Sequence, residues 1–311
     1  MDNEIIYQKP GLFQKKLRRV ISHWELYLFL LPGLAYFLIF KIWPMWALRI
    51  AFQDYNPFNP AKTTFVGWKY FEELFTSRAF PLMLRNTVMI NLMNIVFYFP
   101  LPILLAIALS EIRFKKFKRL CQSIVYLPHF LSWVVVASFT FFILSIDMGL
   151  INKILMQFDI KISFLSNPNL TWIILTFQSI WRETGWGTII FLAAITTISP
   201  SLYEAAAIDG ATRWQQVRNI TLPGISGTIV LILILRMGQM FDVSLEQLLL
   251  MQNPLVMDVA EVFDTYAYTQ GVLRGVISIG ISVGIFKSVL NMGFVLASNF
   301  IVKKLGFDGL F

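Results

Sequence analysis

The sequence predicts an all-α polytopic membrane protein with six transmembrane helices and both termini in the cytoplasm. Of the 311 residues, 57% are hydrophobic and only 14% are charged, too apolar a composition for one soluble core. Apolar stretches long enough to cross about 30 Å of hydrocarbon recur along the chain, and basic residues flank them. The expected spans are residues 25–46, 86–110, 122–146, 171–198, 224–245 and 276–302.

Basic residues set the expected orientation. Most Lys and Arg residues outside the spans lie near the two termini and in the 111–121 and 199–223 loops, which the positive-inside rule assigns to the cytoplasm. We therefore expect a cytoplasmic segment over 1–24, a transmembrane domain over 25–303 and a cytoplasmic tail over 304–311. The first apolar run is too long for the core of a signal peptide, so we expect it to remain as an anchor in the cell membrane.

Composition also excludes several classes of function. The net charge of +8 belongs to residues that flank apolar runs, so it signals topology and no nucleic-acid partner is expected. One cysteine and two histidines argue against a disulfide framework and a metal site. The chain contains no Gly-Lys dipeptide, hence no phosphate-binding P-loop, and no nucleophile-base constellation, so we expect no catalytic site.

The water-compatible stretch 199–223 separates two apolar runs and predicts a helix-turn-helix on the membrane face. Ser199 can cap a first helix, which Gly210 ends because glycine tolerates the backbone needed there. Thr212 and Gln215 fit a capping box for a second helix, which Pro223 is expected to stop.

Small side chains in this stretch would let another backbone approach closely, and its charged groups offer hydrogen bonds to a partner. The residues expected at this docking surface are Glu204, Ala205, Ala206, Asp209, Gly210, Ala211, Arg213, Arg218 and Pro223.

The spacing of this stretch resembles the EAA loop of ABC-importer permeases. It reads Glu204-Ala205-Ala206, three residues, Gly210, nine residues, Ile220, one residue, then Leu222-Pro223. Further stretches are similar to permeases of carbohydrate ABC importers, and most of all to their polysaccharide-permease branch. These stretches are LPHFLSW at 127–133, IWRE at 180–183 and NPL at 253–255.

The resemblance implies an import machine with several subunits. The loop between helices 4 and 5 would form coupling helices in a cleft of a cytoplasmic ATPase, with Glu204, Asp209 and Gly210 holding its shape and Arg213 and Arg218 contacting the ATPase. The partners implied are a second related permease, two ATPase subunits that bind ATP and Mg, an extracellular solute-binding lipoprotein and an oligosaccharide substrate. No cofactor is expected on this chain.

Polar side chains inside the spans indicate where a substrate would pass, because such residues are costly in a bilayer and usually face a cavity or a partner. At about 1.5 Å per helical residue, groups from four spans lie about 20 to 25 Å above the cytoplasmic ends. Gln178, Arg182 and Trp186 share a helix face that combines donors with an aromatic plate, which suits a sugar. The candidates are Asn94, Gln178, Arg182, Trp186, Arg236, Lys287 and Asn291.

Two interpretations of these intramembrane charges stay open. Arg182 and Lys287 can pair with Glu183, with Asp242 or with the second permease and be purely structural, or they can meet solute. The cations exceed the carboxylates. Acidic residues on the second permease would leave a neutral glycan as substrate, which we favour, whereas an anionic sugar such as a uronate would itself pair with Arg182 or Arg236. The cations counted are Lys41, Arg182, Arg236 and Lys287.

Two other functions remain as alternatives. An ABC importer of a non-sugar solute would share the loop and differ only in its substrate. A secondary transporter would use an ion gradient and predicts inverted repeats, and no convincing internal repeat is present.

Overall fold

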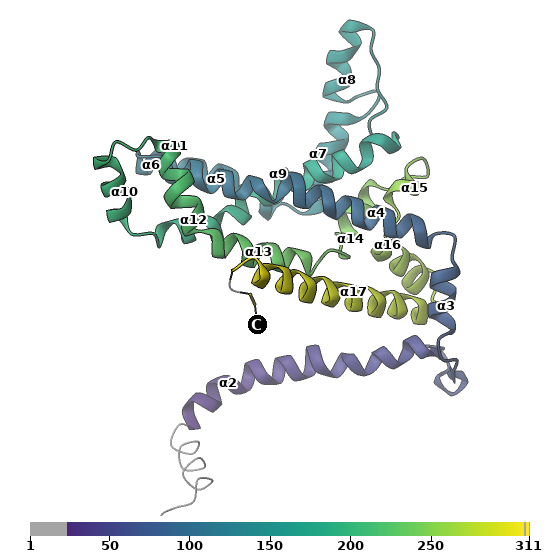
Figure 1. The fold of residues 1–311 in the computed structure, drawn as a ribbon. Helices are drawn as coiled ribbons and strands as arrows, with labels where there is room; N and C mark the ends of the chain where they lie inside the picture. Colours follow the sequence, from purple (N-terminus) through teal and green to yellow (C-terminus); the bar gives the residue numbers. More distant parts are fainter. Residues whose placement is uncertain (1–23, 308, 311) are drawn as a thin grey trace, which may run out of the picture. The chain divides into compact units, whose positions relative to one another are not determined.

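The computed structural model describes residues 24–307, 309 and 310, and these residues are mostly helical (Figure 1). The chain divides into two compact units, Met1–Ile50 and Ala51–Phe311. Nearly all of the predicted N-terminal segment 1–24 and part of the tail 304–311 lie outside the described residues.

The first long helix runs over Trp24–Phe52 and covers the predicted span 25–46. It consists of α2 (Trp24–Phe37), a π-helical turn η1 (Leu38–Ile42) and a 3₁₀ segment η2 (Trp43–Phe52).

Within the second unit, further long helices match predicted spans. Residues Phe80–Glu111 form one helix, and α9 and α17 are the others. Their parts are α4 (Phe80–Met93), the π-helical turn η4 (Asn94–Tyr98), α5 (Pro100–Glu111), α9 (Pro168–Thr196) and α17 (Ile277–Lys304).

Among the described residues, three helices are long and apolar enough to cross a membrane, and three bent helix pairs bring the number of candidate spans to as many as six. The single helices are Trp24–Phe52, Phe80–Glu111 and Ile277–Lys304. The bent pairs are Lys115–Phe130 with Trp133–Leu144 at 99°, Pro168–Thr196 with Pro200–Ile208 at 70°, and Arg213–Gly224 with Ser226–Met237 at 58°.

Two predicted spans are not continuous helices. The stretch 122–146 contains the end of α6 (Lys115–Tyr126), the 3₁₀ turn η5 (Leu127–Phe130) and α7 (Trp133–Leu144). It breaks because Pro128 lacks an N–H group and Ser132 starts a new helix, its Oγ accepting from the N–H of Val135 at 3.4 Å.

The predicted span 224–245 is also interrupted, and a serine again caps the helix that follows the break. Helix α13 (Ser226–Met237) ends before Gly238, and Ser244 caps the next helix, α14 (Leu245–Met251), by accepting from the N–H of Gln247 at 3.4 Å. Irregular backbone at membrane depth is tolerated where it is buried in protein or lines a water-filled cavity.

The remaining elements are short. Strands β1 (Gln53–Asp54) and β2 (Thr64–Phe65) form an antiparallel pair in which Gln53 lies opposite Phe65. The short helices and turns outside the 199–223 loop are η3 (Pro60–Lys62), α3 (Lys69–Thr76), α8 (Leu150–Leu155), η6 (Met156–Phe158), α15 (Met257–Ala260), α16 (Phe263–Ala267) and η8 (Tyr268–Leu273).

Three of the π-helical turns stand just before prolines. A proline leaves a carbonyl without its usual donor and its ring crowds the preceding turn, and a π-helical turn relieves both by moving the bond one residue further back. Before Pro100, for example, the N–H of Phe99 donates to the carbonyl of Asn94 at 2.9 Å. The turns are Leu38–Ile42 before Pro44, Asn94–Tyr98 before Pro100, and Val217–Thr221 before Pro223.

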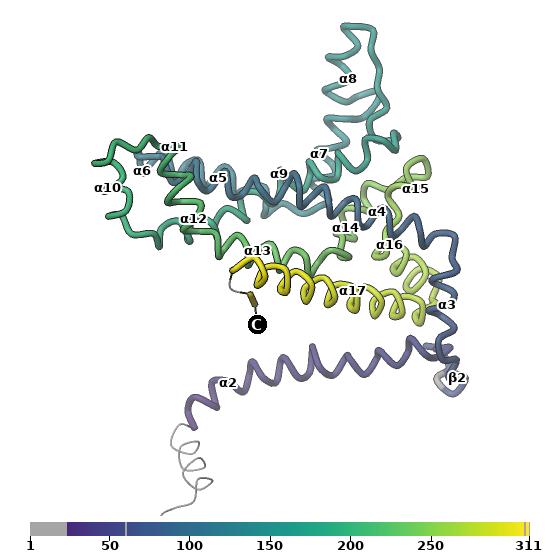
Figure 2. The backbone as a smooth tube through the Cα atoms, in the orientation of Figure 1, coloured from purple at the N-terminus to yellow at the C-terminus, as the bar shows by residue number. Residues whose placement is uncertain are grey.

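Packing within the second unit brings distant segments together. Helix α5 packs along α9, and α13 packs against α17 (Figure 2). The segment between α14 and α17, which the sequence left outside the spans, enters the core, where Phe263 is fully buried against α17. Outside the spans, the hydroxyl of Tyr70 donates to Asp54 Oδ1 at 2.8 Å. The pKa of Tyr70 rises to about 12, mainly because the group is buried and secondly because of this hydrogen bond.

Candidate functional site

The 199–223 loop begins with α10 (Pro200–Ile208), which ends at Gly210 as predicted. Gly210 has a φ of +77°. The N–H of Ala211 donates to the carbonyl of Ala206 at 2.8 Å, and the N–H of Gly210 donates to Ala207 at 3.2 Å. This pair of bonds is a Schellman ending, which needs the left-handed backbone that glycine adopts without strain.

The second half of the loop carries the predicted capping box. The N–H of Gln215 donates to Thr212 Oγ1 at 3.3 Å, and the N–H of Thr212 donates to Gln215 Oε1 at 2.7 Å. Pro223 does not end this helix, because α11 (Arg213–Gln216), the turn η7 and α12 (Leu222–Gly224) are continuous and the bend falls at Ile225. The π-helical turn accommodates Pro223.

A side-chain contact joins the two helices of the loop; α10 is mainly exposed, whereas Gln216, Val217 and Thr221 of the second helix are buried. The hydroxyls of Tyr203 and Thr221 lie 3.0 Å apart, and Arg213 forms an exposed ion pair with Glu111 at 3.8 Å. Among the described residues, the side chains of Glu204, Asp209 and Arg218 form no hydrogen bond or ion pair. These three groups are therefore available to another subunit.

Two exposed apolar side chains on the loop were not among the predicted residues. Ile208 is 87% exposed and Trp214 is 69% exposed. Both stand beside polar groups on a loop that the sequence analysis places outside the spans, and exposed apolar groups rimmed by polar ones mark protein interfaces.

Within the candidate spans, the guanidinium of Arg182 is bound by other residues of the same chain. Its guanidinium pairs with Glu183, its Nε donates to the carbonyl of Leu131 at 3.0 Å, and it lies 4.6 Å from the centroid of the Trp133 ring. His129 Nδ1 lies 2.8 Å from Glu183 Oε2. The cluster thus fastens α9 to the break between α6 and α7, and a place for Arg182 on the substrate path stays a prediction.

Gln178, Arg182 and Trp186 share a face of α9, on which Gln178 is buried whereas Trp186 is 47% exposed. Gln178 is only 5% exposed, and its amide donates to Thr140 Oγ1 at 2.7 Å and accepts from Gln247 at 2.9 Å. Trp186 stacks on His129 with the ring centroids 4.5 Å apart. Helices α7 and α14 therefore pack over Gln178, and its place on the substrate path stays a prediction.

Lys287 is likewise neutralised within the chain. Its ammonium pairs with Asp264 and lies 2.9 Å from Asp242 Oδ1. Asn291 donates to Asp242 Oδ2 at 2.8 Å and accepts from the N–H of Phe241 at 2.9 Å, so this network ties α17 to the break after α13. Asp264 was not predicted, because it lies in a segment assigned outside the spans.

The remaining predicted path residues, Asn94 and Arg236, both lie near Tyr98. The guanidinium carbon of Arg236 lies 4.9 Å from the centroid of the Tyr98 ring. Asn94 stands four residues before Tyr98, and its Oδ1 is buried without a hydrogen-bond partner among the described residues. Tyr98 was missed by the sequence reasoning, although its place one turn after Asn94 is a signal that could have found it.

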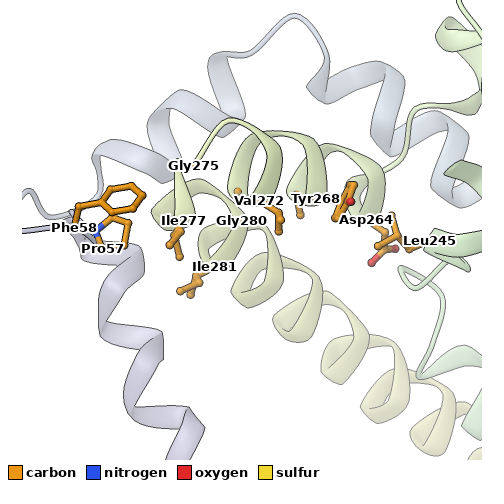
Figure 3. Close-up of a pocket in the computed structure, with 12 residues that line it drawn as sticks. Pro57, Phe58, Leu245, Asp264, Tyr268, Val272, Gly275, Ile277, Gly280 and Ile281 are labelled. Carbon is orange, nitrogen blue, oxygen red and sulfur yellow. The ribbon is translucent and has the colours of Figure 1, made fainter.

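A cavity of about 700 Å³ opens beside the Lys287 network (Figure 3). Its walls come from the loop before η3, from α16 and η8, and from the first turns of α17, and they are mainly apolar. Asp264 and Tyr268 contribute the polar groups on one wall, whereas Pro57 and Phe58 stand at another (Figure 3). The sequence reasoning did not anticipate this cavity.

Comparison with known proteins identifies the family. Residues 98–306 match the family described as binding-protein-dependent transport system inner membrane component. The chain belongs to this family. Its place in the membrane and its role as an ABC-transporter permease follow from that membership, and they agree with the apolar helices described above.

Individual relatives cover nearly the whole permease. Protein LplB of Bacillus subtilis is 46% identical over 288 residues, which is 92% of this chain and 91% of the relative. The polygalacturonan/rhamnogalacturonan transport system permease protein YteP of the same organism is 44% identical, covering 99% of this chain and 96% of the relative. A solved bacterial alginate ABC transporter, in complex with an alginate pentasaccharide-bound periplasmic protein, contains a chain that is 36% identical with a TM-score of 0.85, covering 94% of this chain and 99% of that one.

Proposed function

We propose that this permease is the transmembrane subunit of an ATP-binding-cassette importer that takes up an oligosaccharide delivered by an extracellular solute-binding protein. The observation that carries the proposal is the full-length similarity to permeases whose names specify polysaccharides, polygalacturonan/rhamnogalacturonan and alginate. The solved alginate transporter was captured with its periplasmic protein and a pentasaccharide, which supports both the delivery protein and the oligomeric substrate.

The proposed topology has six spans, cytoplasmic termini and the 199–223 loop between spans 4 and 5. The six candidate spans support it, and so do the basic residues on the faces assigned to the cytoplasm. The domain limits are proposed as predicted, with the transmembrane domain over 25–303 between the segments 1–24 and 304–311. In this topology the breaks after η5 and α13 lie at membrane depth, as do the broken helices around the substrate sites of other transporters.

The 199–223 loop is proposed to dock into a separate ATPase. Its Schellman turn and capping box fix its shape, while Glu204, Asp209, Arg213 and Arg218 offer charged contacts to the ATPase. Ile208 and Trp214 add apolar anchors of the kind that dominate protein interfaces. Ala205, Ala206, Ala211 and Pro223 complete the proposed coupling surface.

The assembly proposed around this chain includes a second related permease, two ATPase subunits and a solute-binding lipoprotein. ATP and Mg bind the ATPase subunits, and the permease contributes no catalytic site. Of the predicted path residues, Asn94, Trp186 and Arg236 keep groups available to solute. Arg182, Lys287 and Asn291 serve to hold the broken helices together.

Transport by purified subunits in liposomes tests the proposal. We expect ATP-dependent uptake of oligosaccharide only when the chain is combined with a second permease, two ATPases and the solute-binding protein, because one permease lines half of a path. Omitting the binding protein or the ATPases is the matched control and should remove uptake. Solute movement by this chain alone, or uptake driven by an ion gradient without ATP, would contradict the proposed function.

A further inference from the structure

The charge balance inside the second unit singles out one cation. Arg182 pairs with Glu183, and Lys287 pairs with Asp242 and Asp264. Arg236 has no carboxylate within ion-pair distance among residues 51–307. A charged side chain without a counter-ion in a span is costly, and it normally faces a cavity, a partner or a ligand.

The position of Arg236 leaves its donors available. It stands in the last turn of α13, immediately before the break at Gly238, and lies over the ring of Tyr98. A cation–π contact of this kind engages the face of the guanidinium, whereas its N–H groups point outward in the plane. The Tyr98 hydroxyl lies within hydrogen-bonding reach of the Arg236 side chain, and because a guanidinium carries five N–H donors, others remain available to a ligand. The negative end of the α13 dipole stabilises the positive charge of Arg236, but this interaction does not use the N–H donors of its guanidinium.

A neighbouring residue provides a hydrogen-bond acceptor, in contrast to the donors of Arg236. Asn94, one turn before Tyr98, holds a buried carbonyl oxygen that lacks a donor among the described residues. On the other side, Tyr98 stands against Gly187 of α9, where a Cβ would lie 3.3 Å from its hydroxyl, so the ring has no room for a larger neighbour there. Next to the Tyr98 ring the chain therefore carries a cationic fork, and one turn earlier on the same helix it carries an acceptor without a donor among the described residues.

An acidic sugar carries a binding partner for the guanidinium of Arg236 and another for the side-chain oxygen of Asn94. Its carboxylate matches the guanidinium fork with two parallel hydrogen bonds, and its hydroxyl groups can donate to the Asn94 oxygen. A neutral sugar would leave the charge of Arg236 without a counter-ion, and a carboxylate from the second permease would leave the Asn94 oxygen without a donor.

We propose that Arg236 binds a carboxylate of the glycan during its passage and that Asn94 accepts from a hydroxyl of the same glycan. The substrate is then an acidic, uronate-type oligosaccharide, in place of the neutral glycan that the sequence favoured. This inference rests on the proposed function, because it assumes that a glycan passes through the permease.

The test is a competition in liposomes that contain the complete transporter. A mixed partial hydrolysate of polygalacturonate, alginate, starch and arabinan is supplied with the solute-binding protein and ATP, and the imported saccharides are identified by mass spectrometry. The ratio of acidic to neutral products is independent of how much transporter folds. The variants are Arg236→Gln, Arg236→Lys and Asn94→Leu, with Arg274→Gln as an exposed control.

We expect the unaltered transporter to import acidic oligosaccharides preferentially. Because a hydrogen bond to a charged group contributes about 1.5 to 3 kcal/mol, Arg236→Gln should lower the acidic-to-neutral ratio about 10- to 100-fold. Arg236→Lys should give an acidic-to-neutral ratio between those of the unaltered transporter and Arg236→Gln, since lysine keeps the charge but cannot form two parallel hydrogen bonds. Asn94→Leu should lower uptake of both classes, and Arg274→Gln should leave the ratio unchanged.

Other outcomes separate the inference from the proposed function. An unaltered ratio in Arg236→Gln, or preferential import of neutral saccharides by the unaltered transporter, would overturn the carboxylate site and leave the importer function standing. A loss of subunit assembly in Arg236→Gln with an unchanged ratio would assign the cation to a carboxylate of the second permease. Import of no saccharide of either class would contradict the proposed function itself.

Discussion

Replacing Gly210 with Leu should reduce ATP-driven uptake at least about tenfold while the protein remains in the membrane. The φ of +77° costs a residue with a Cβ about 1 to 2 kcal/mol, and the strain falls on the Schellman bonds that end α10. Apart from the adjacent residues, no described atom lies within 4 Å of the added Cβ, so the side chain would project into the space that we assign to the ATPase. Uptake, membrane yield and recovery of bound ATPase are the quantities to measure.

Two companion variants separate strain from obstruction. Gly210→Asn adds a side chain that tolerates the left-handed region, so it should still impair ATPase binding if obstruction matters. Gly67→Leu introduces comparable strain at a φ of +61°, also in open surroundings, but in the segment before α3. It should leave ATPase binding intact. Normal uptake by a well-expressed Gly210→Leu variant would exclude the coupling role of this turn.

Replacing Lys287 with Met should destabilise the permease by about 3 to 5 kcal/mol, because it leaves the carboxylates of Asp242 and Asp264 without their shared cation. The side chains of Lys287 and Asp264 are only 9% and 24% exposed, so water solvates this pair poorly, and most of the loss comes from Asp264 because Asp242 is 52% exposed. Unfolding of the assembled complex in detergent, followed by fluorescence against denaturant concentration, gives the loss.

The exposed pair of Lys161 and Asp147, with Nζ and Oδ1 at 2.9 Å, provides a matched control. Lys161→Met should cost about 0 to 1 kcal/mol, as exposed ion pairs do. A triple variant that adds Asp242→Asn and Asp264→Asn to Lys287→Met should recover most of the lost stability, since neither carboxylate is then left without its cation. Equal losses for Lys287→Met and Lys161→Met would show that the network does not stabilise the helix breaks.

Local patterns carried the successful parts of the sequence analysis. The turn at Gly210 and the capping box of Thr212 and Gln215 depend on residues a few positions apart, so their geometry is encoded where it occurs. The long helices α9 and α17 follow from continuous apolar stretches. The pairing of Arg182 with Glu183 was foreseen as an alternative, since the two residues are adjacent.

Features that depend on packing between distant segments could not be predicted in the same way. Hydropathy does not register the break at Ser132, because the residues on both sides remain largely apolar. Gln178 faces the predicted side of its helix, but only the positions of α7 and α14 show that this side is covered. Asp264 reaches Lys287 because α16 folds into the core, which its short apolar pattern did not indicate.

The central claim is that the 199–223 loop is the surface through which a separate ATPase drives import. Replacing exposed Trp214 with a photoreactive benzoylphenylalanine, and illuminating the active, assembled transporter, tests this claim most directly. We predict a crosslinked product that contains the ATPase subunit and the peptide around residue 214, with no such product when the probe replaces exposed Phe158 in η6. A transporter that imports oligosaccharide normally while the probe at position 214 reaches only lipid or the other permease would contradict the account.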